Sequence, residues 1–381
     1  MRIESIDGLL IANEVARTSY LVRITTDSGL IGIGQSGSWG FPDAVAKVVD
    51  QYRPTLIGED PFRIEYIQQA LYRSRPFRGN IIWGALSAID IALWDIKAQH
   101  FSVPVWELLG GRLRDRVRLH ALIFAADPDD LRRQALEMAE AGFTAIKFDP
   151  FQAGYQDHTM PRIIAGAREM AAAAREAVGL DVDIIFELHR KMTPMRSVAV
   201  ANALAEFQPL FVEDPIQIDS IDLQGDLVGR FEYPLANGER LDTIWEFRDL
   251  LARGAQYLRP DLGQAGGLTG CKKIAALGEA HHAAFVSHNY LSPLLTAAAV
   301  HLAVSIPNFL TQEYHLLDES QHPGTVLFRT SIRREGGYIA TPEAPGLGVE
   351  LDEALVAQAP PAEHSLDIGL YRDDGSPAYA G

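Results

Sequence analysis

The stretch IIFELHRKM, residues 184–192, begins with apolar residues typical of a buried strand and then places an acid and an imidazole two positions apart. Successive side chains of a strand point to opposite faces, so we expect Glu187 and His189 to share one face with Ile185. Two ionisable groups then converge on a single space at the end of an apolar strand. The alternative is a strand end that frays into solvent.

A repeated pattern of short apolar segments and Ala-rich helical segments runs through the chain from about Val117. Eight strands that alternate with helices are typical of a parallel sheet, and eight such units in roughly 230 residues fit a closed (β/α)₈ barrel of the TIM type. The predicted strands are LHALIF, TAIKFD, DIIFEL, PLFVED, PLANGE, QYLRPD, AAFVSH and NFLTQE.

Ionisable residues stand at the ends of six of these strands at a nearly constant spacing of 22 to 27 residues. One βα unit per step places one polar group at the same end of each successive strand, which in a barrel is the C-terminal mouth where catalytic groups lie. Scattered surface charges would not keep this period. The pattern therefore favours side chains that converge at the mouth over a strand end that frays into solvent. The series is Glu187, Glu213, Glu239, Asp261, His288 and Glu313.

The composition is that of a globular protein, with 381 residues of which 47% are hydrophobic and 22% are charged. The 34 basic and 50 acidic residues give a formal charge of −16. This acidic balance argues against nucleic acid or an anionic membrane as a partner. We expect a homo-oligomer that binds a small molecule.

The single cysteine, Cys271, excludes an intramolecular disulfide and a thiolate metal site, and it fits a reducing compartment. Glu4 and Asp7 interrupt the N-terminal segment where a signal peptide would need an apolar core. We therefore expect a cytoplasmic protein.

The chain divides into three parts by pattern. Residues 1–115 mix α and β signals, with a hairpin predicted in YLVRITTDSGLIGIGQ and a helix in WGALSAIDIALWDIKAQH. Residues 116–335 contain the predicted barrel. Residues 336–381 lose the repeat, and we expect them to return to the N-terminal part, which we call the capping domain.

Three of the strand-end acids, Glu187, Glu213 and Glu239, come from consecutive strands and are expected to project into one space. Three carboxylates without a counter-charge repel one another, which raises their pKa values or requires a cation. A hard divalent ion with oxygen ligands is the simplest solution, and Mg²⁺ is its usual form. Asp214, next to Glu213, is expected to face the other way.

The other polar strand ends suggest acid–base chemistry. Asp261 and His288 end neighbouring strands, and a carboxylate beside an imidazole fixes the tautomer and raises the basicity that a general base needs. A purely structural hydrogen-bonded pair is the alternative. Lys147, on the second strand, either balances a substrate carboxylate or forms an ion pair with a glutamate, and Glu313 closes the series.

The order of these residues on successive strands resembles the mandelate racemase subgroup of the enolase superfamily. The segment SAIDIALWDIKAQHFSVPVWELLGG resembles the capping domain of that family, so the resemblance covers nearly the whole chain. It implies a modified enolase-type barrel with an α+β cap. Five segments resemble acid-sugar dehydratases of the galactonate and mannonate type, namely ELHRKMTPMRSVAVANAL, VEDP, GERL, AGGLTGCKKIA and SIPNFLTQEY.

The resemblance also implies the roles of the site residues. The three glutamates would hold one Mg²⁺ per active site. His288 with Asp261 would remove the proton α to a carboxylate, and His189 would assist departure of the β-hydroxyl. Glu313 would hydrogen-bond the carboxylate oxygen that gains charge in the ene-diolate. An aldonic acid, such as a galactonate-like acid, would become a 2-keto-3-deoxy acid.

Two positions depart from the pattern of the family. Racemases of the subgroup carry Lys-x-Lys at the second strand, whereas this chain has Lys147-x-Asp149, so the second base is absent and a two-base racemase is disfavoured. Galactonate-type enzymes carry Asp-x-His at the third strand, whereas this chain has Glu187-x-His189. The side chain of Glu187 is one methylene longer than that of the aspartate.

Candidate substrate-binding residues lie in loops that can cover the barrel mouth. The segment GQSGSWGF contains Trp39, and YRSRPFRGN contains Arg75 and Arg78. Gly-rich loops of this kind are suited to closing over a site and excluding water. Asp149 and Tyr155 of the barrel are further candidates. Ordinary surface turns are the alternative for each of them.

Three other functions stay open. An isomerase, epimerase or lactone cycloisomerase would use the same ene-diolate without losing water, although His189 has no task in a lactone isomerisation. A Schiff-base lyase would use Lys147 as its nucleophile, but three aligned glutamates make little sense there. A sugar-acid binding protein without catalysis is the third, since a fold does not imply a function.

Overall fold

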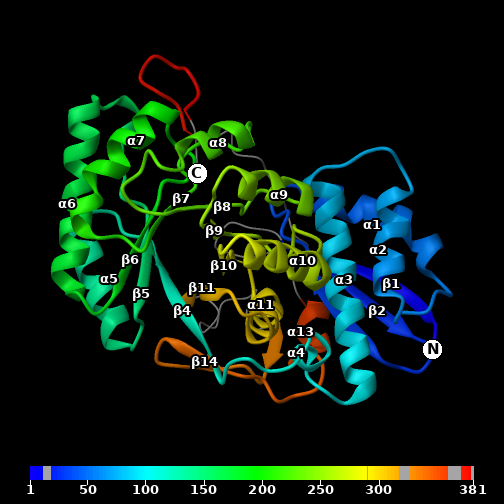
Figure 1. The fold of residues 1–381 in the computed structure, drawn as a ribbon. Helices are drawn as coiled ribbons and strands as arrows, with labels where there is room; N and C mark the ends of the chain where they lie inside the picture. Colours follow the sequence, from blue (N-terminus) through cyan, green and yellow to red (C-terminus); the bar gives the residue numbers. More distant parts are fainter. Residues whose placement is uncertain (12–18, 290, 317–326, 359–369, 379–381) are drawn as a thin grey trace.

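The computed structural model in Figure 1 shows two units side by side, a barrel on the left and a smaller α+β unit on the right. It describes residues 1–11, 19–289, 291–316, 327–358 and 370–378. Among the helices in these ranges, none combines the length and the apolar character that a membrane crossing requires.

The N-terminal unit is a three-stranded antiparallel sheet with three helices, and the strands lie in the order β1-β2-β3. The predicted hairpin is confirmed, since β2 pairs with β3 and Gly29 takes a positive φ of 83° in the turn. Sheet and helices share one apolar core. The elements are β1 (Ile3–Ile11), β2 (Ser19–Thr26), β3 (Ile31–Gln35), α1 (Pro42–Leu56), α2 (Ile64–Arg73) and α3 (Asn80–Phe101).

Helix α3 is buried along most of its 22 residues because it lies between the sheet of this unit and the barrel. Strand β3 crosses it so closely that a Cβ atom at Gly34 would lie 1.9 Å from the carbonyl oxygen of Ala88. At Gly32 the corresponding distance to the oxygen of Ala92 is 2.1 Å. Two glycines therefore permit the contact that positions the sheet against the helix.

The barrel consists of eight parallel strands, and each predicted strand segment overlaps one of them. Pairing of the last strand with the first, with Glu313 opposite His120, closes the sheet. The predicted (β/α)₈-type barrel with an α+β cap is thus confirmed. The strands are β4 (Arg116–Ile123), β5 (Ala145–Phe148), β6 (Asp183–Glu187), β7 (Phe211–Glu213), β8 (Leu235–Asn237), β9 (Tyr257–Leu258), β10 (Ala284–Ser287) and β11 (Phe309–Tyr314).

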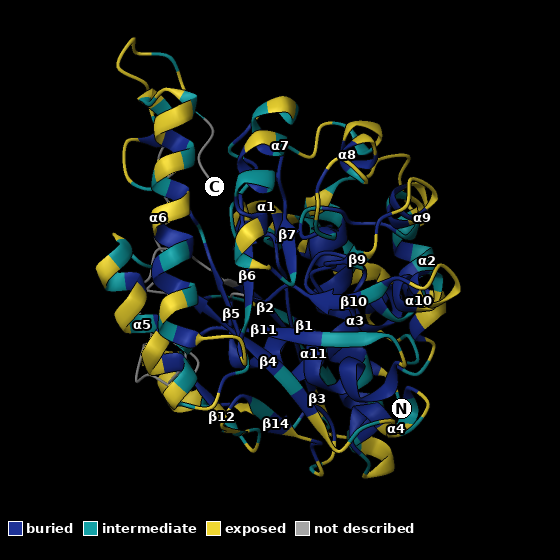
Figure 2. Cartoon of the chain, turned by 60° about the vertical axis from the view of Figure 1, so that its left-hand side comes forward, coloured by how far each residue is buried: buried dark blue, intermediate teal, exposed yellow. Residues whose placement is uncertain are grey.

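Seven helices of the described chain connect these strands, and Figure 2 shows the buried strands with exposed outer faces on helices such as α6. Capping residues in the sequence mark where two of these helices begin. Asp127 accepts hydrogen bonds from the first turn of α5, and Thr243 with Glu246 forms a capping box on α9. The helices are α5 (Pro128–Glu140), α6 (Met160–Val178), α7 (Pro194–Ala203), α8 (Ile221–Leu227), α9 (Ile244–Ala252), α10 (Gly267–Ala280) and α11 (Pro293–Ser305).

The segment after β11 contacts both units. Strand β14 (Tyr338–Ala340) pairs antiparallel with β4, while Glu353 forms an ion pair with Arg23 of the N-terminal sheet at 2.7 Å. The described part of the C-terminus reaches the barrel rim, where the amide of Asp373 donates to Asp157 at 2.9 Å. The boundaries after residues 115 and 335 remain a proposal, and residues 359–369 and 379–381 lie outside the described chain.

Two buried aspartates of α3 join the capping unit to its neighbours. Asp90 accepts a hydrogen bond from the amide of Thr269 at 3.0 Å, at the start of α10. Asp95 accepts from the amides of Ile33 at 3.2 Å and Leu347 at 2.9 Å. Burial raises the pKa of Asp90 to about 7 and that of Asp95 to about 6.

Replacement of Gly34 by Ala should destabilise the protein, because the new methyl group meets the backbone of α3. We expect a loss of about 1–3 kcal/mol in the free energy of unfolding, as for other overpacked sites. Thermal unfolding of Gly40→Ala is the control, since nothing lies within 4 Å of a Cβ at that position. Equal melting temperatures of the two variants would contradict the close crossing.

Replacement of Asp90 by Asn should change how stability depends on pH. The folded wild type keeps this proton up to a pH of about 7, whereas the unfolded chain loses it near 3.8, so the wild type loses stability as pH rises between these values. Relative to the wild type, Asp90→Asn should gain about 2–3 kcal/mol between pH 5 and pH 8 in urea unfolding. Exposed Asp181→Asn is the control, and parallel curves for all three proteins would refute the expectation.

Candidate active site

Three glutamates meet at the C-terminal mouth of the barrel. Glu187 ends β6, Glu213 ends β7 and Glu239 follows β8 by two residues. All three are buried, and one oxygen from each lies within 4.8 Å of the others, which is the only such group of potential metal ligands in the part of the chain that the structure describes. The expected convergence of consecutive strand ends is thus present.

Two buried cations lie among these carboxylates. Lys147 Nζ lies 3.0 Å from both Glu187 and Glu213 and 2.8 Å from Glu313. Arg259 Nη2 donates to Glu313 at 2.7 Å, and its Nε lies 2.5 Å from Glu213. Burial lowers the pKa of Lys147, but the three glutamates outweigh it and hold the pKa above its ordinary value. Of the two roles considered for Lys147, this structure displays the ion pair.

The glutamate group fits a hard divalent cation. Glu213 Oε2 is buried and accepts no hydrogen bond from the described chain. Burial, with Glu187 nearby, raises the pKa of Glu213 well above its ordinary value. A divalent ion would supply the missing positive charge and coordinate this oxygen, and all-oxygen ligands suit Mg²⁺ or Ca²⁺.

His288 is held by a carboxylate on the opposite side of the barrel from β6. Its Nδ1 lies 2.7 Å from Asp261 Oδ2, and its Nε2 lies 3.2 Å from Glu239. The second oxygen of Asp261 accepts from the amide of Gly263 at 2.6 Å. A Cβ at Gly37 of the capping unit would lie 2.7 Å from that oxygen, so the cap closes directly behind the pair.

His189 forms a second pair of the same kind. Its Nδ1 lies 2.8 Å from Asp149 Oδ2, and its amide donates to Glu187 at 3.0 Å. Strand β6 ends at Glu187, and both His189 and Arg190 take left-handed conformations with φ of 46° and 60°. The acid and the imidazole therefore converge through a turn and not through the strand alternation that we expected.

Three arginines around the site were missed by the sequence analysis. Arg190 Nη1 donates to Asp214 at 2.6 Å and also contacts Glu239. Burial raises the pKa of Glu239, but Arg240 and Arg190 outweigh it and hold the pKa well below its ordinary value. Arg259 stands two residues before Asp261, and residues two apart in a strand share one face. Strand alternation could therefore have predicted that Arg259 faces the same side as Asp261.

The mouth contains a cavity of about 280 Å³. It is lined by both histidines and by Lys147, Asp149 and Lys191, among others. A larger cavity of about 850 Å³ lies between β3, α3 and the C-terminal strands, but it contains none of the paired histidines or glutamates of the mouth. The smaller cavity is the candidate active site because the ionisable groups converge there.

The five candidate substrate residues are spread over a wider area. Asp149 lines the mouth cavity itself. Trp39 approaches the mouth, since the guanidinium of Arg240 lies 5.6 Å from its ring centre. Arg78 lines a neighbouring groove, and Arg75 is exposed and donates to a carbonyl of its own loop.

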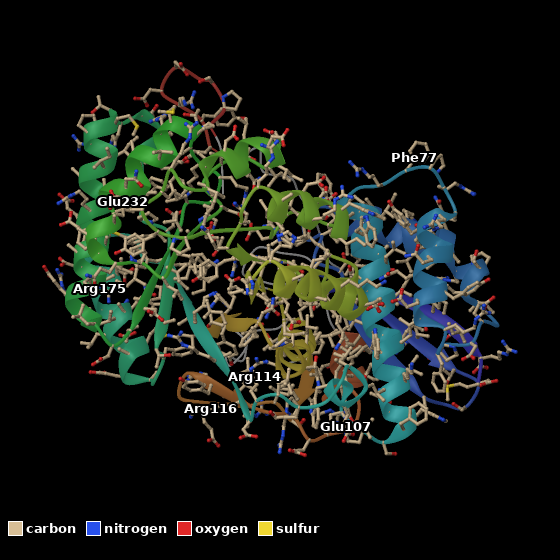
Figure 3. The ribbon with its side chains drawn as sticks, in the orientation of Figure 1. Phe77, Glu107, Arg114, Arg116, Arg175 and Glu232 are labelled. Carbon is tan, nitrogen blue, oxygen red and sulfur yellow. The ribbon has the colours of Figure 1, made fainter. Side chains whose placement is uncertain are left out.

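Tyr155, the last of the five, lies behind Lys191, whose Nζ is 5.2 Å from its ring centre. Figure 3 shows Phe77 at the tip of the loop that carries Arg75 and Arg78, at the outer edge of the capping unit. The structure thus brings Asp149, Trp39 and Tyr155 to the mouth or its rim and leaves Arg75 away from it.

Comparisons with known proteins agree with this architecture. Residues 130–355 match the family described as Enolase C-terminal domain-like, and residues 11–110 match the Mandelate racemase / muconate lactonizing enzyme, N-terminal domain. A D-galactonate dehydratase of Variovorax paradoxus is 34% identical over 91% of this chain and 92% of its own. A D-galactonate dehydratase of Verminephrobacter eiseniae is 35% identical over 88% and 90%.

Solved structures of the same fold cover nearly all of the chain. An enolase from Agrobacterium radiobacter, crystallised with Na and L-malate bound, has a TM-score of 0.93 and 32% identity over 100% of both chains. A mandelate racemase/muconate lactonizing enzyme from Jannaschia sp. CCS1 has a TM-score of 0.88 and 32% identity over 96% of this chain and 99% of its own.

Replacement of Glu213 by Gln should weaken binding of a divalent cation at least tenfold, about 1.4 kcal/mol, because it removes the charge of one of the three carboxylates that could hold the ion, together with the unsatisfied oxygen. Calorimetric titration with Mg²⁺ and Mn²⁺ measures this affinity. The exposed Glu140→Gln is the control, and circular dichroism checks that both variants are folded. Unchanged affinity in Glu213→Gln would remove this residue from the metal site.

Proposed function

The chain belongs to the mandelate racemase/muconate lactonizing enzyme family and is an acid-sugar dehydratase, and from that premise we propose that it eliminates water from an aldonic acid such as galactonate, with Mg²⁺, to give a 2-keto-3-deoxy acid. The observation that carries the proposal is the opposed pair of imidazoles. His189 follows β6 and His288 follows β10, four strands apart in an eight-stranded barrel, and both line one cavity.

His288 is the proposed base. Asp261 at its Nδ1 fixes the tautomer that leaves a lone pair on Nε2, and the side chain lines the mouth cavity. This nitrogen takes the proton α to the substrate carboxylate, and the electron pair moves onto that carboxylate. Held by Glu187, Glu213 and Glu239, Mg²⁺ would stabilise the negative charge that develops there.

Lys147 is the proposed source of positive charge beside the substrate carboxylate, since its ammonium group is held among three glutamates at the mouth. Glu313 accepts from Arg259 and from the amide of Asn289 and pairs with Lys147. Burial raises the pKa of Glu313, but these cations outweigh it and hold the pKa well below its ordinary value. An ionised Glu313 cannot donate, so we assign it to the positioning of Lys147 in place of the donor role expected from the resemblance.

His189 is the proposed acid. Asp149 at its Nδ1 directs Nε2 to the cavity, where the imidazolium gives its proton to the β-hydroxyl as the carbon–oxygen bond breaks. Water leaves, and the resulting enol becomes the 2-keto acid. Because base and acid stand on opposite sides of the mouth, we propose an anti elimination.

An epimerase or isomerase is the second candidate, since two opposed imidazoles also suit proton removal on one face and return on the other. Such an enzyme would exchange the α-proton and release no water. A lactone cycloisomerase would likewise need His288 but not a proton from His189. The products therefore separate these candidates.

Dehydration should be detectable as 2-keto-3-deoxy acid, assayed with semicarbazide, in a stereochemical library of six-carbon aldonic acids with Mg²⁺. His189→Asn should lower the rate about 10²- to 10⁴-fold, the usual contribution of a general acid, while α-proton exchange in D₂O persists. The exposed His281→Asn is the control. Full dehydration by His189→Asn would refute its role, and exchange without any keto product would favour the isomerase.

A further inference from the structure

The turn after β6 contains two residues whose backbone is left-handed although they carry a side chain. In the part of the chain that the structure describes, six residues other than glycine have a φ in this region. Left-handed backbone is disfavoured for such residues because the Cβ atom crowds the following carbonyl oxygen. Three of the six stand at or directly after the end of a helix, where a single left-handed residue is common, namely Ser102, Gln208 and His282.

The other three gather at the mouth of the barrel. His189 and Arg190 follow β6, with φ of 46° and 60°, and Asp214 follows β7, with φ of 38°. The amide of Arg190 donates to the carbonyl of Asp214 at 2.7 Å, and its Nη1 donates to Asp214 Oδ2 at 2.6 Å. We call this double contact the Arg190–Asp214 clamp. It joins the ends of two neighbouring strands through residues whose own conformation is unfavourable.

The clamp is buried and fixed from several sides. The side chain of Arg190 is 8% exposed and that of Asp214 is 3% exposed. A hydrogen bond between charged groups is stronger than one between neutral groups, and a buried charge without its partner is costly. Gln217 Nε2 also donates to the carbonyl of Arg190 at 3.3 Å. Arg190 is thus held at its amide, its carbonyl and its guanidinium group, and such surroundings can keep a backbone that is unfavourable by itself.

The turn reaches both strands that flank β6, which are β5 and β7. His189 and Lys191 both contact Asp149, which follows β5. Arg190, between them, contacts Asp214, which follows β7. A different φ at Arg190 would turn these contacts relative to one another. The position of His189 in the mouth therefore depends on the conformation of the next residue.

We propose that Arg190 is a positioning residue that, through the clamp, holds the turn after β6 in its left-handed form and presents His189 to the mouth. This inference rests on the proposed dehydratase function, in which His189 gives a proton to the leaving hydroxyl. His288 follows β10, four strands from β6, and has its own partner in Asp261. Loss of the turn should therefore impair the elimination of water and leave removal of the α-proton intact.

Two variants separate the backbone of Arg190 from its side chain. Arg190→Ala and Arg190→Gly both remove the guanidinium group with its contacts to Asp214 and Glu239, but only glycine adopts left-handed backbone freely. With Mg²⁺ and galactonate, or another aldonic acid that the library shows to be dehydrated, Arg190→Ala should form the keto product about 5- to 30-fold more slowly than Arg190→Gly. Both variants should exchange the α-proton in D₂O at equal rates.

The matched controls are Gln208→Ala and Gln208→Gly. Gln208 is exposed and left-handed at the end of η2 (Ala205–Phe207). Urea unfolding should show that Gln208→Ala is the less stable of the two, since alanine disfavours this backbone. Both should nevertheless form the keto product at equal rates, because this left-handed residue is not part of the turn that presents His189.

Two results would overturn the proposal. Equal product rates of Arg190→Ala and Arg190→Gly would mean that only the charge of the guanidinium group matters, since both variants lack it. An equal loss of product formation and of exchange in Arg190→Ala, relative to Arg190→Gly, would mean that the mouth is disturbed as a whole. If Arg190→Ala does not fold, Asp214→Asn takes its place. This variant weakens the clamp by removing a charge, so product formation should fall while exchange stays unchanged, and unaltered product formation would overturn the proposal.

A failure of the proposed function is distinguishable from a failure of this inference. If no aldonic acid of the library gives a keto product with the wild type, the dehydratase function fails, and the role of Arg190 is decided without a substrate. In crystal structures of the two variants, His189 Nδ1 should stay beside Asp149 in Arg190→Gly and have lost that contact in Arg190→Ala. The same placement of His189 in both variants would overturn the positioning role alone.

Discussion

The compensation of buried negative charge at the mouth of the barrel is the constraint on which the site depends. Glu187, Glu213 and Glu313 are at most 1% exposed and lie on three different strands. Charges of one sign at this depth are tolerated only when paired, and removal of one partner leaves an uncompensated charge. Lys147 and Arg259 supply the pairing within the chain. The same cations therefore support folding and set the electrostatics in which a substrate carboxylate would bind.

Much of the barrel could be predicted from the sequence because it depends on a period. A spacing of about 25 residues reports one βα unit, and the end of each unit carries the polar residue that faces the mouth. The turn after β6 could not be predicted in this way. Left-handed conformations at His189 and Arg190 are rare for residues with a side chain, and local propensity does not encode them. They are held by contacts to Asp149 and Asp214, which come from other strands.

The missed arginines have a related cause. Arg190 and Arg240 directly follow the residues that the strand pattern singled out, and alternation alone would direct them away from the mouth. Both turn back because the strands have already ended. The cap loops were hard to predict for a different reason. Whether Trp39 or Arg75 approaches the mouth depends on how α3 packs against the barrel. At that contact a Cβ atom at Gly267 of α10 would lie 2.3 Å from Asp90 Oδ2 of α3.

The contact of Gly37 with Asp261 makes the two units parts of one catalytic apparatus. The amide of Gly37 donates to the carbonyl of Gly263 at 2.7 Å, and no side chain fits between this loop and the carboxylate that orients His288. In evolutionary terms the cap cannot be exchanged like an independent module. A cap inherited from another protein would have to preserve a residue without a side chain at this point. Changes of sequence that alter ligand specificity are therefore confined to loops that leave this backbone contact intact.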